Sequence, residues 1–214
     1  MKTHCRVVVI GGGVVGVSTL YHLAKKGWDD CVLIERRELT SGSTWHAAGL
    51  LPLFNMSYSV GQIHKYSVNL YQGLEAETGQ YAGFSNVSNI RLATNPDRMD
   101  EYMQYAGVAQ TIGVDVQLLS PDEVVEYWPL AVKDNLIGAI RHPADGYIQP
   151  ADLTQALAKG ARDNGGEIYR NTTVTAISRT SSGEWKVSTY KGEIICEHFV
   201  YCTVNFALNT CKMA

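Results

Sequence analysis

The stretch that decides the fold is residues 5–35, CRVVVIGGGVVGVSTLYHLAKKGWDDCVLIE. It begins with the apolar, β-branched run 5–10, which predicts a buried parallel strand. Residues 14–26 then follow helical spacing, and Gly27 predicts the end of that helix. The second apolar run, 31–35, predicts another strand. Strand, helix and strand within about thirty residues form a βαβ unit with a right-handed crossover.

The turn between the first strand and the helix is GGGVVG, residues 11–16, which fits the pattern G-x-G-x-x-G. Gly11 permits the tight turn, Gly13 lets the backbone approach a pyrophosphate, and Gly16 permits close packing of helix on strand. A plain structural turn would use the same glycines. Glu35 favours a dinucleotide, because a carboxylate at the end of the second strand can accept a hydrogen bond from a ribose 2′-hydroxyl. The same carboxylate disfavours the 2′-phosphate of NADP.

The loop after the second strand bears on the choice between NAD and FAD, which the glycine motif alone does not separate. Residues 40–51, TSGSTWHAAGLL, supply four hydroxyl groups and glycines whose backbone can turn toward an anion. A second polar loop along the pyrophosphate suits a permanently held FAD, whereas an NAD site usually continues into an ordinary helix. We therefore expect FAD, with an NAD-binding module and a plain surface loop as the alternatives.

Composition and charge exclude several classes of partner. The chain has 214 residues with a formal net charge of −3 and contains no Lys/Arg cluster, which argues against binding to nucleic acid or an anionic membrane. No stretch approaches the roughly 20 apolar residues of a spanning helix, so we expect a soluble protein. Five scattered cysteines without a CxxC pair argue for a reducing compartment and against a zinc or other metal site. We expect a cytoplasmic protein, or one of the mitochondrial matrix if a transit peptide precedes these residues.

The remainder of the chain mixes helical and strand patterns. Helical spacing covers 60–77, and SPDE at 120–123 is a capping box that opens a short helix. Strands are predicted at 88–94 and 136–141. Between residues 167 and 201, four alternating segments separated by turn residues predict antiparallel strands joined by hairpins. The fold class is therefore α/β.

Four segments together resemble a known group of enzymes. TSGSTWHAAGLL (40–51), ETGQ (77–80), SNIRLAT (88–94) and DGYIQPADLTQALAKGAR (145–162) resemble the dimethylglycine and sarcosine dehydrogenases. These are FAD-dependent amine oxidoreductases of the D-amino-acid oxidase group. The resemblance runs from about residue 5 to 200 and corresponds to the N-terminal portion of family members.

The resemblance implies a division into domains. A Rossmann-like FAD-binding domain would comprise 1–50 and 145–214, and an inserted, incomplete α+β substrate domain would comprise 51–144. After residue 202 the family carries a strand that runs into a small-residue turn containing glycine. The last twelve residues here, TVNFALNTCKMA, contain none, so we expect a truncated or altered end. Because family members continue well past this point, we expect weak or no turnover by these 214 residues alone.

The resemblance also implies a set of cofactor contacts. Glu35 and Arg36 would lie at the adenosine ribose, residues 42–50 along the pyrophosphate and flavin, and Val174 at the adenine through its backbone. His46 stands where these dehydrogenases bond a histidine to the flavin 8α-methyl group; the alternative is a hydrogen-bonded histidine beside a noncovalent flavin. The expected cofactor residues are Gly11, Gly13, Val14, Val15, Gly16, Glu35, Arg36, Gly42, Ser43, Thr44, Trp45, His46, Ala47, Ala48, Gly49, Leu50 and Val174.

The implied reaction is oxidation of an N-methylated amino acid such as dimethylglycine or sarcosine, by hydride transfer from the N-methyl carbon to flavin. The implied partners are the small amine substrate and an electron acceptor, for which an electron-transfer flavoprotein is a candidate. No catalytic residue can be assigned from the motifs. Arg91, in the predicted strand 88–94, has a guanidinium fork that can bind a carboxylate, but nothing else in the sequence supports that role. The rival interpretation is a non-catalytic FAD-binding fragment.

Overall fold

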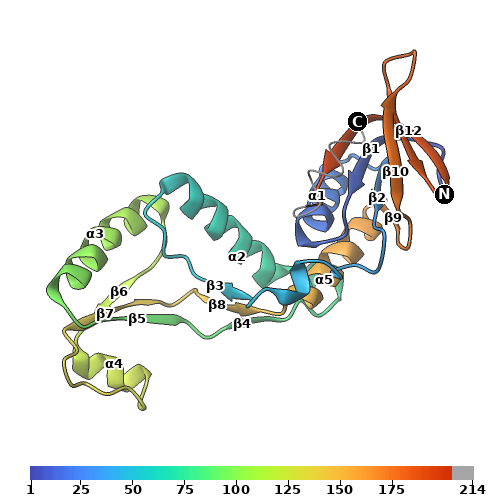
Figure 1. Ribbon diagram of the computed structural model, residues 1–214. Helices are drawn as coiled ribbons and strands as arrows, with labels where there is room; N and C mark the ends of the chain where they lie inside the picture. The colour runs from blue at the N-terminus through green and yellow to red at the C-terminus, as the bar shows by residue number, and fades with distance from the viewer. Residues whose placement is uncertain (204–214) are drawn as a thin grey trace. The chain divides into compact units, whose positions relative to one another are not determined.

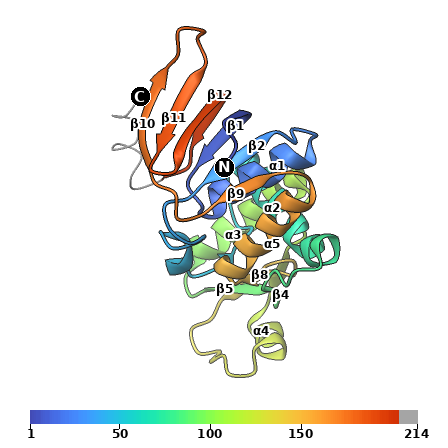
Figure 2. The ribbon, with the colours of Figure 1, turned by 90° about the vertical axis from the view of Figure 1, so that its right-hand side faces the viewer.

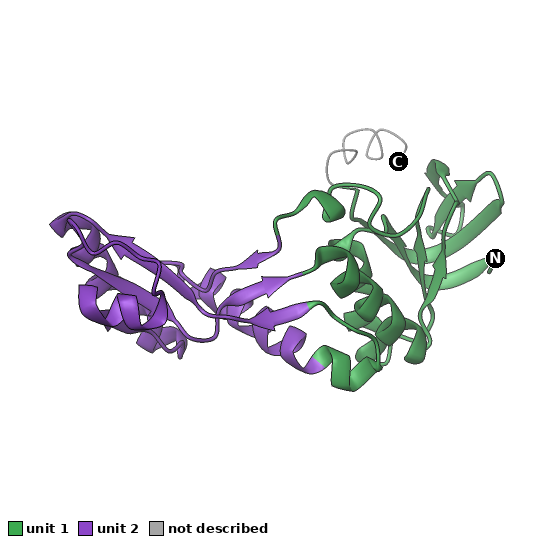
Figure 3. Cartoon of the chain, turned by 90° about the horizontal axis from the view of Figure 1, so that it is seen from below, with its two compact units in different colours: residues 1–48, 74–83, 149–214 green, residues 49–73, 84–148 purple. Residues whose placement is uncertain are grey.

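The computed structural model describes residues 1–203, and two units can be distinguished in it (Figure 3). The first unit comprises residues 1–48, 74–83 and 149–214, and the second comprises 49–73 and 84–148. The predicted altered end, residues 203–214, lies outside the described residues except for Thr203. Among the described residues, none of the helices has the length and apolarity that a bilayer crossing requires.

The first unit is built on a six-stranded sheet with the order β10-β11-β12-β1-β2-β9 (Figures 1 and 2). The strands β12, β1, β2 and β9 run parallel, and β10, β11 and β12 are antiparallel neighbours. The strands are β1 (His4–Ile10), β2 (Cys31–Ile34), β9 (Glu167–Tyr169), β10 (Val174–Arg179), β11 (Trp185–Thr189) and β12 (Gly192–Tyr201).

The predicted βαβ unit is confirmed as β1, α1 (Val14–Lys25) and β2. The two strands are almost wholly buried, in keeping with their continuous apolar sequence. Helix α1 packs against α5 (Pro150–Asp163). Their approach depends on Gly160, where a Cβ would lie 2.8 Å from the ring of Tyr21.

One strand prediction is wrong. The segment beginning at Glu167 was expected to pair antiparallel with the strand that follows it, but β9 instead pairs in parallel with β2 at the sheet edge. The preceding helix α5 supplies the crossover that parallel pairing requires. The other three alternating segments do form the antiparallel ladder β10-β11-β12, and β12 also pairs in parallel with β1.

The second unit contains two three-stranded antiparallel sheets, with orders β3-β8-β4 and β5-β7-β6. Three helices accompany them, of which α2 also contributes its last turn to the first unit. A short 3₁₀ helix, η1 (Thr44–His46), belongs to the first unit. The elements of the second unit are β3 (Leu50–Leu51), α2 (Tyr58–Thr78), β4 (Phe84–Asn86), β5 (Asn89–Ala93), α3 (Pro96–Ile112), β6 (Gln117–Leu119), α4 (Pro121–Tyr127), β7 (Gly138–His142) and β8 (Gly146–Ile148).

The division into units differs from the expected one at residues 49–50 and 145–148, which belong to the second unit, and at residues 74–83. Segment 74–83 belongs to the first unit, where side chains of α1 bind it. Glu77 accepts hydrogen bonds from the Tyr21 hydroxyl and the Lys25 ammonium, both at 2.7 Å. The Gln149 backbone N–H donates to the Gly83 carbonyl oxygen at 3.0 Å.

Candidate dinucleotide-binding site

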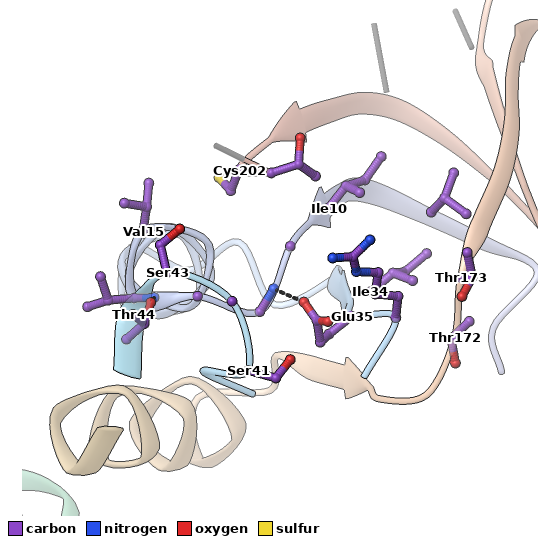
Figure 4. Close-up of a pocket in the computed structure, with 18 of the residues that line it drawn as sticks. Ile10, Val15, Ile34, Glu35, Ser41, Ser43, Thr44, Thr172, Thr173 and Cys202 are labelled. Carbon is purple, nitrogen blue, oxygen red and sulfur yellow. Dashed lines mark hydrogen bonds between the residues drawn. The ribbon is translucent and has the colours of Figure 1, made fainter. Parts of the chain in front are cut away.

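A cavity of about 450 Å³ lies in the first unit, at the carboxyl ends of β1 and β2 and beside the N-terminus of α1 (Figure 4). Segments far apart in the sequence line it. These are the glycine-rich turn, the end of β2, the loop after β2, the start of β10 and the residues after β12. The lining residues are Ile10, Gly11, Gly12, Gly13, Val14, Val15, Ile34, Glu35, Arg36, Ser41, Gly42, Ser43, Thr44, Ala47, Thr172, Thr173, Val174, Cys202 and Thr203.

The glycine-rich turn has the tight geometry that its motif predicts. Gly11 has φ +117°, and a Cβ there would lie 2.6 Å from the Cys202 carbonyl oxygen. At Gly16 a Cβ would lie 1.9 Å from the Gly11 carbonyl oxygen, so only glycine lets the helix approach the strand this closely. At Gly13 a Cβ would contact the Thr44 hydroxyl at 3.0 Å, where the loop after β2 passes the turn.

The carboxylate of Glu35 is held beside the cavity by two backbone donors. Gly12 N–H donates to Oε2 at 2.7 Å, drawn as a dashed line in Figure 4, and Arg37 N–H donates to Oε1 at 2.8 Å. Each carboxylate oxygen can accept a further hydrogen bond. The side chain is thereby fixed in orientation and still able to accept from a ligand hydroxyl.

The loop after β2 is fastened to the glycine-rich turn at two points. The Thr40 N–H donates to the Gly12 carbonyl oxygen at 2.9 Å, and the Val14 N–H donates to the Thr44 hydroxyl oxygen at 3.0 Å. Val14 is the first residue of α1, so Thr44, which is buried, satisfies a helix N–H that has no partner within the helix. The Thr44 hydroxyl hydrogen remains available for donation.

His46 lies in the 3₁₀ turn of this loop, with its ring exposed. Its Nδ1 is 3.1 Å from the Gly42 carbonyl oxygen, and its ring centroid is 4.0 Å from that of Trp45. A carbonyl accepts only from a protonated nitrogen, so this contact favours the neutral tautomer with the proton on Nδ1 and the lone pair on Nε2. Trp45 is 60% exposed and packs against the imidazole.

The structure brings most of the expected cofactor residues to one cavity and places a few elsewhere. Gly16 supports the turn from the helix side, and Trp45, His46 and Ala48 belong to the same unit but are outside the cavity lining. Gly49 and Leu50 belong to the second unit. The expected residues that line the cavity are Gly11, Gly13, Val14, Val15, Glu35, Arg36, Gly42, Ser43, Thr44, Ala47 and Val174.

Sequence reasoning missed several lining residues. Thr172 and Thr173 immediately precede Val174, and Cys202 follows β12, whose carboxyl end meets that of β1. Parallel pairing of these strands would have indicated Cys202, but the sequence alone did not reveal that β12 lies beside β1. Burial raises the pKa of the Cys202 thiol, while its contact with the Thr19 hydroxyl acts in the opposite direction.

The chain is similar to curated proteins over most of its length. Mitochondrial dimethylglycine dehydrogenase of Rattus norvegicus is 40% identical over 212 residues, which are 99% of this chain and 25% of that protein. Mitochondrial sarcosine dehydrogenase of Homo sapiens is 40% identical over 178 residues, which are 83% of this chain and 19% of that protein. The chain thus spans about a quarter or less of the length of these curated relatives.

The fold is also found among solved structures. The crystal structure of L-proline dehydrogenase from P. horikoshii matches with a TM-score of 0.90 and 28% sequence identity, covering 100% of this chain and 56% of that chain. A sequence profile described as "FAD dependent oxidoreductase" (DAO) matches residues 6–210. The chain therefore belongs to the DAO family of FAD-dependent oxidoreductases.

Proposed function

We propose that the cavity of the first unit binds FAD and that the protein oxidises an N-methylated amino acid of the dimethylglycine or sarcosine type. The observation that carries the first part is the Glu35 carboxylate, fixed by two backbone N–H groups at the edge of a cavity that begins at the glycine-rich turn. Similarity to the dimethylglycine and sarcosine dehydrogenases supports the proposed substrate class. Membership of an FAD-dependent family argues against the alternative of an NAD-binding module.

The residues present fit a dinucleotide with an adenosine and a pyrophosphate group. Glu35 would accept from the ribose hydroxyl, and the backbone around Gly13 and Val15 would approach the pyrophosphate without a side chain at Gly13 in the way. The Thr44 hydroxyl hydrogen would add a donor beside it. Val174, which also lines the cavity, would meet the adenine through its backbone.

When bound, FAD would supply the chemistry by accepting the N-methyl hydride of the substrate, leaving an iminium that water hydrolyses to the demethylated amine and formaldehyde. The chain's own residues would orient the cofactor and hold it in place. The loop that carries His46 is tied to the turn by Thr40 and Thr44, so its position relative to α1 is determined before any ligand arrives. Such preorganisation lowers the entropic cost of binding.

We further propose that His46 would become bonded to the flavin 8α carbon through Nε2; the imidazole N–H and one methyl C–H bond would break, and the flavin ring would take up the two electrons and two protons until the electron acceptor removes them. The Nδ1 of His46 faces the Gly42 carbonyl oxygen, so the lone pair of the neutral imidazole would be on Nε2, and the residue is exposed. The remaining expected partner is an electron acceptor, with an electron-transfer flavoprotein as the candidate. The four described cysteines are free thiols, which supports a reducing compartment such as the cytoplasm or the mitochondrial matrix.

Reconstitution with FAD tests the proposal. The purified chain is incubated with FAD, freed of excess by gel filtration, and its visible spectrum is recorded before and after anaerobic addition of N,N-dimethylglycine. Retained flavin absorption that bleaches on addition supports both parts of the proposal. Retained absorption that does not bleach supports the second candidate, an FAD-binding chain without turnover of its own. A folded chain that retains no flavin contradicts the proposal.

Acid precipitation of the same sample tests the covalent bond. Yellow colour in the pellet of the wild-type chain, and its loss to the supernatant in His46→Ala, is the expected result. His22→Ala is the matched control, because His22 belongs to the same unit but lies in helix α1, with its Nδ1 2.7 Å from the Ser18 carbonyl oxygen, and not in the loop after β2. Colour in the supernatant of the wild type would contradict covalent attachment while leaving FAD binding in place.

A further inference from the structure

Glu38, in the loop after β2, connects two segments that line the cavity, although it is not itself a lining residue. Its Oε2 accepts a hydrogen bond from the Arg170 guanidinium at 2.5 Å, and its Oε1 accepts one from the Asn171 side-chain amide at 2.9 Å. Both donors lie between β9 and β10, 132 and 133 positions further along the chain. Glu38, Arg170 and Asn171 together form the Glu38 cluster.

Backbone hydrogen bonds join the same two segments. The Asn171 N–H donates to the Arg37 carbonyl oxygen at 3.1 Å, and the Thr172 N–H donates to the Glu35 carbonyl oxygen at 2.9 Å. Glu35 and Thr172 both line the cavity, and Figure 4 shows each on its own segment. The Glu38 cluster therefore lies where the position of one cavity wall relative to the Glu35 carboxylate is determined.

Asn171 has a backbone conformation that few residues adopt easily. Its φ is +52°, in the left-handed region, which asparagine tolerates better than most residues other than glycine. Glycine would permit the same turn but has no amide to donate to Glu38. The hydrogen bond from Asn171 lowers the pKa of Glu38, and the charge of Arg170 acts in the same direction, so the carboxylate is ionised at neutral pH.

We propose that the Glu38 cluster positions the cavity wall that receives the adenosine half of the cofactor, which makes Glu38 a positioning residue for dinucleotide binding. Thr172, Thr173 and Val174 follow Asn171 directly and line the cavity, so a shift at Asn171 would displace them. Glu38 is exposed, and exposed ion pairs contribute little to global stability, so the expected effect is on ligand affinity. The choice of adenosine as the group received rests on the proposed function.

Glu193 on β12 provides a matched control in the same unit. Its carboxylate is exposed, lies 3.3 Å from the Lys186 ammonium, and accepts a hydrogen bond from the Ser188 hydroxyl at 3.1 Å. Glu193 thus has one cationic and one uncharged partner, as Glu38 has. None of these three control residues lines the cavity.

The test compares the two halves of FAD on the full chain. Binding of ADP, which contains the adenosine and the pyrophosphate, is measured by isothermal titration calorimetry, and binding of FMN by fluorescence titration. We expect Glu38→Ala to weaken ADP binding by about three- to fivefold and to leave FMN binding unchanged. Glu193→Ala should match the wild type for both ligands.

An exchange of donor and acceptor makes the test specific to the Glu38 cluster. Asn171→Asp keeps a residue that tolerates the left-handed turn but replaces the amide donor with a second carboxylate facing Glu38. ADP binding should weaken at least as much as in Glu38→Ala. Adding Glu38→Gln to this variant supplies an amide that can donate to the new carboxylate, so ADP affinity should return toward the wild-type value.

Three outcomes overturn the inference: unchanged ADP affinity in Glu38→Ala, equal losses of ADP and FMN affinity, or no recovery in the double variant. Circular dichroism shows whether each variant is folded, and the comparison of Asn171→Asp with the double variant decides the matter if Glu38→Ala is not. A wild-type chain that binds neither ADP nor FAD overturns the proposed function and this inference with it. A wild-type chain that binds ADP no better than its variants overturns this inference alone.

Discussion

Gly16 is the residue of the first unit at which an added methyl group has the least room. A Cβ there would lie 1.9 Å from the Gly11 carbonyl oxygen, a backbone atom that cannot move without shifting the turn. We expect Gly16→Ala to lower the free energy of unfolding by about 3 kcal/mol or more, and to abolish FAD retention. Urea unfolding followed by circular dichroism measures the first effect, and the flavin spectrum of the gel-filtered chain measures the second.

Gly73→Ala is the control for that variant. Gly73 is in α2, and a Cβ there would meet nothing within 4 Å. Alanine is favoured over glycine in helices by up to about 1 kcal/mol, so this variant should be unchanged or slightly more stable. Equal stability losses in Gly16→Ala and Gly73→Ala would contradict the packing role of Gly16.

Thr44 joins the loop after β2 to the first turn of α1. Replacing it with valine keeps the shape of this buried residue but leaves the half-buried Val14 N–H without its acceptor. We expect Thr44→Val to lower the free energy of unfolding by about 1–2 kcal/mol, and to weaken FAD binding. Thr44→Ser keeps the hydroxyl, so its losses of unfolding free energy and of FAD affinity should each be less than half of those in Thr44→Val. If serine and valine were equally damaging, the methyl group rather than the hydroxyl would be the important feature.

The glycines and Glu35 could be predicted from the sequence because the role of each depends on a short stretch of chain. Thr44 was predicted only as a hydroxyl facing an anion, because the bond to Val14 joins residues 30 positions apart and depends on how the loop folds back. Thr172 was missed for a related reason. Its place at the cavity follows from the Thr172 N–H donating to the Glu35 carbonyl oxygen at 2.9 Å, a contact that no local pattern encodes.

At the scale of elements, the turn between β7 and β8 is a junction of the second unit. Asp145 in this turn is wholly buried; its Oδ1 accepts from the Leu53 N–H at 2.9 Å and its carbonyl oxygen from the Ser88 N–H at 2.8 Å. The side chain therefore ties the segment after β3 to the turn. Burial of its carboxylate raises the pKa of Asp145 from 3.8 to about 6.

This raised pKa predicts how stability depends on pH. Because its pKa is raised in the folded state, the Asp145 carboxyl group contributes stability that is fully present below pH 3.8. This stability is lost as pH rises through about 6. An asparagine side chain at this position would keep the bond to Leu53 without a charge. As pH rises from 4 to 7, the free energy of unfolding of Asp145→Asn should therefore rise relative to that of the wild type, by at most roughly 3 kcal/mol. Urea unfolding at several pH values measures the difference. A difference that is constant with pH would show that Asp145 titrates normally.

His142, at the end of β7, should show the opposite trend. Its pKa is lowered to about 4, so the stability it contributes is present above pH 6.5 and lost as pH falls through 4. As the solution is acidified, the free energy of unfolding of His142→Gln should therefore rise relative to that of the wild type. The relative gain of Asp145→Asn should disappear over the same change in pH. Asp145 and His142 are neighbours, so opposite pH dependences of the unfolding free energies of their variants would separate these local titrations from a general effect of acid.

The long elements were predictable because their periodicity extends over many residues. The helix predicted at 60–77 is α2, and the capping box at 120–123 is confirmed by both of its bonds between Ser120 and Glu123. The strands β3, β4, β6 and β8 were not predicted, since two or three residues carry no readable alternation. The direction of β9 was mistaken because the sequence of a strand does not specify its partner.

At the scale of the whole molecule, the sequence indicated a nucleotide-binding unit interrupted by a second unit. It did not indicate that residues 74–83 return to the first unit, since that assignment depends on Glu77 meeting Tyr21 and Lys25. The division into a cofactor domain and a substrate domain remains a prediction about function. The family and its FAD dependence, by contrast, were readable from the motifs and agree with the comparisons.

The central claim is that the cavity of the first unit recognises FAD through its adenosine and pyrophosphate parts. Its most direct test is a fluorescence titration of the full chain with FAD and, separately, with FMN, which contains the flavin but lacks the adenosine half. The account predicts saturable binding of FAD and at least about tenfold weaker binding of FMN, because FMN lacks the adenosine that Glu35 would contact and offers the glycine-rich turn one phosphate instead of two. Equal affinity for the two flavins, or no binding of FAD by the folded chain, would contradict it.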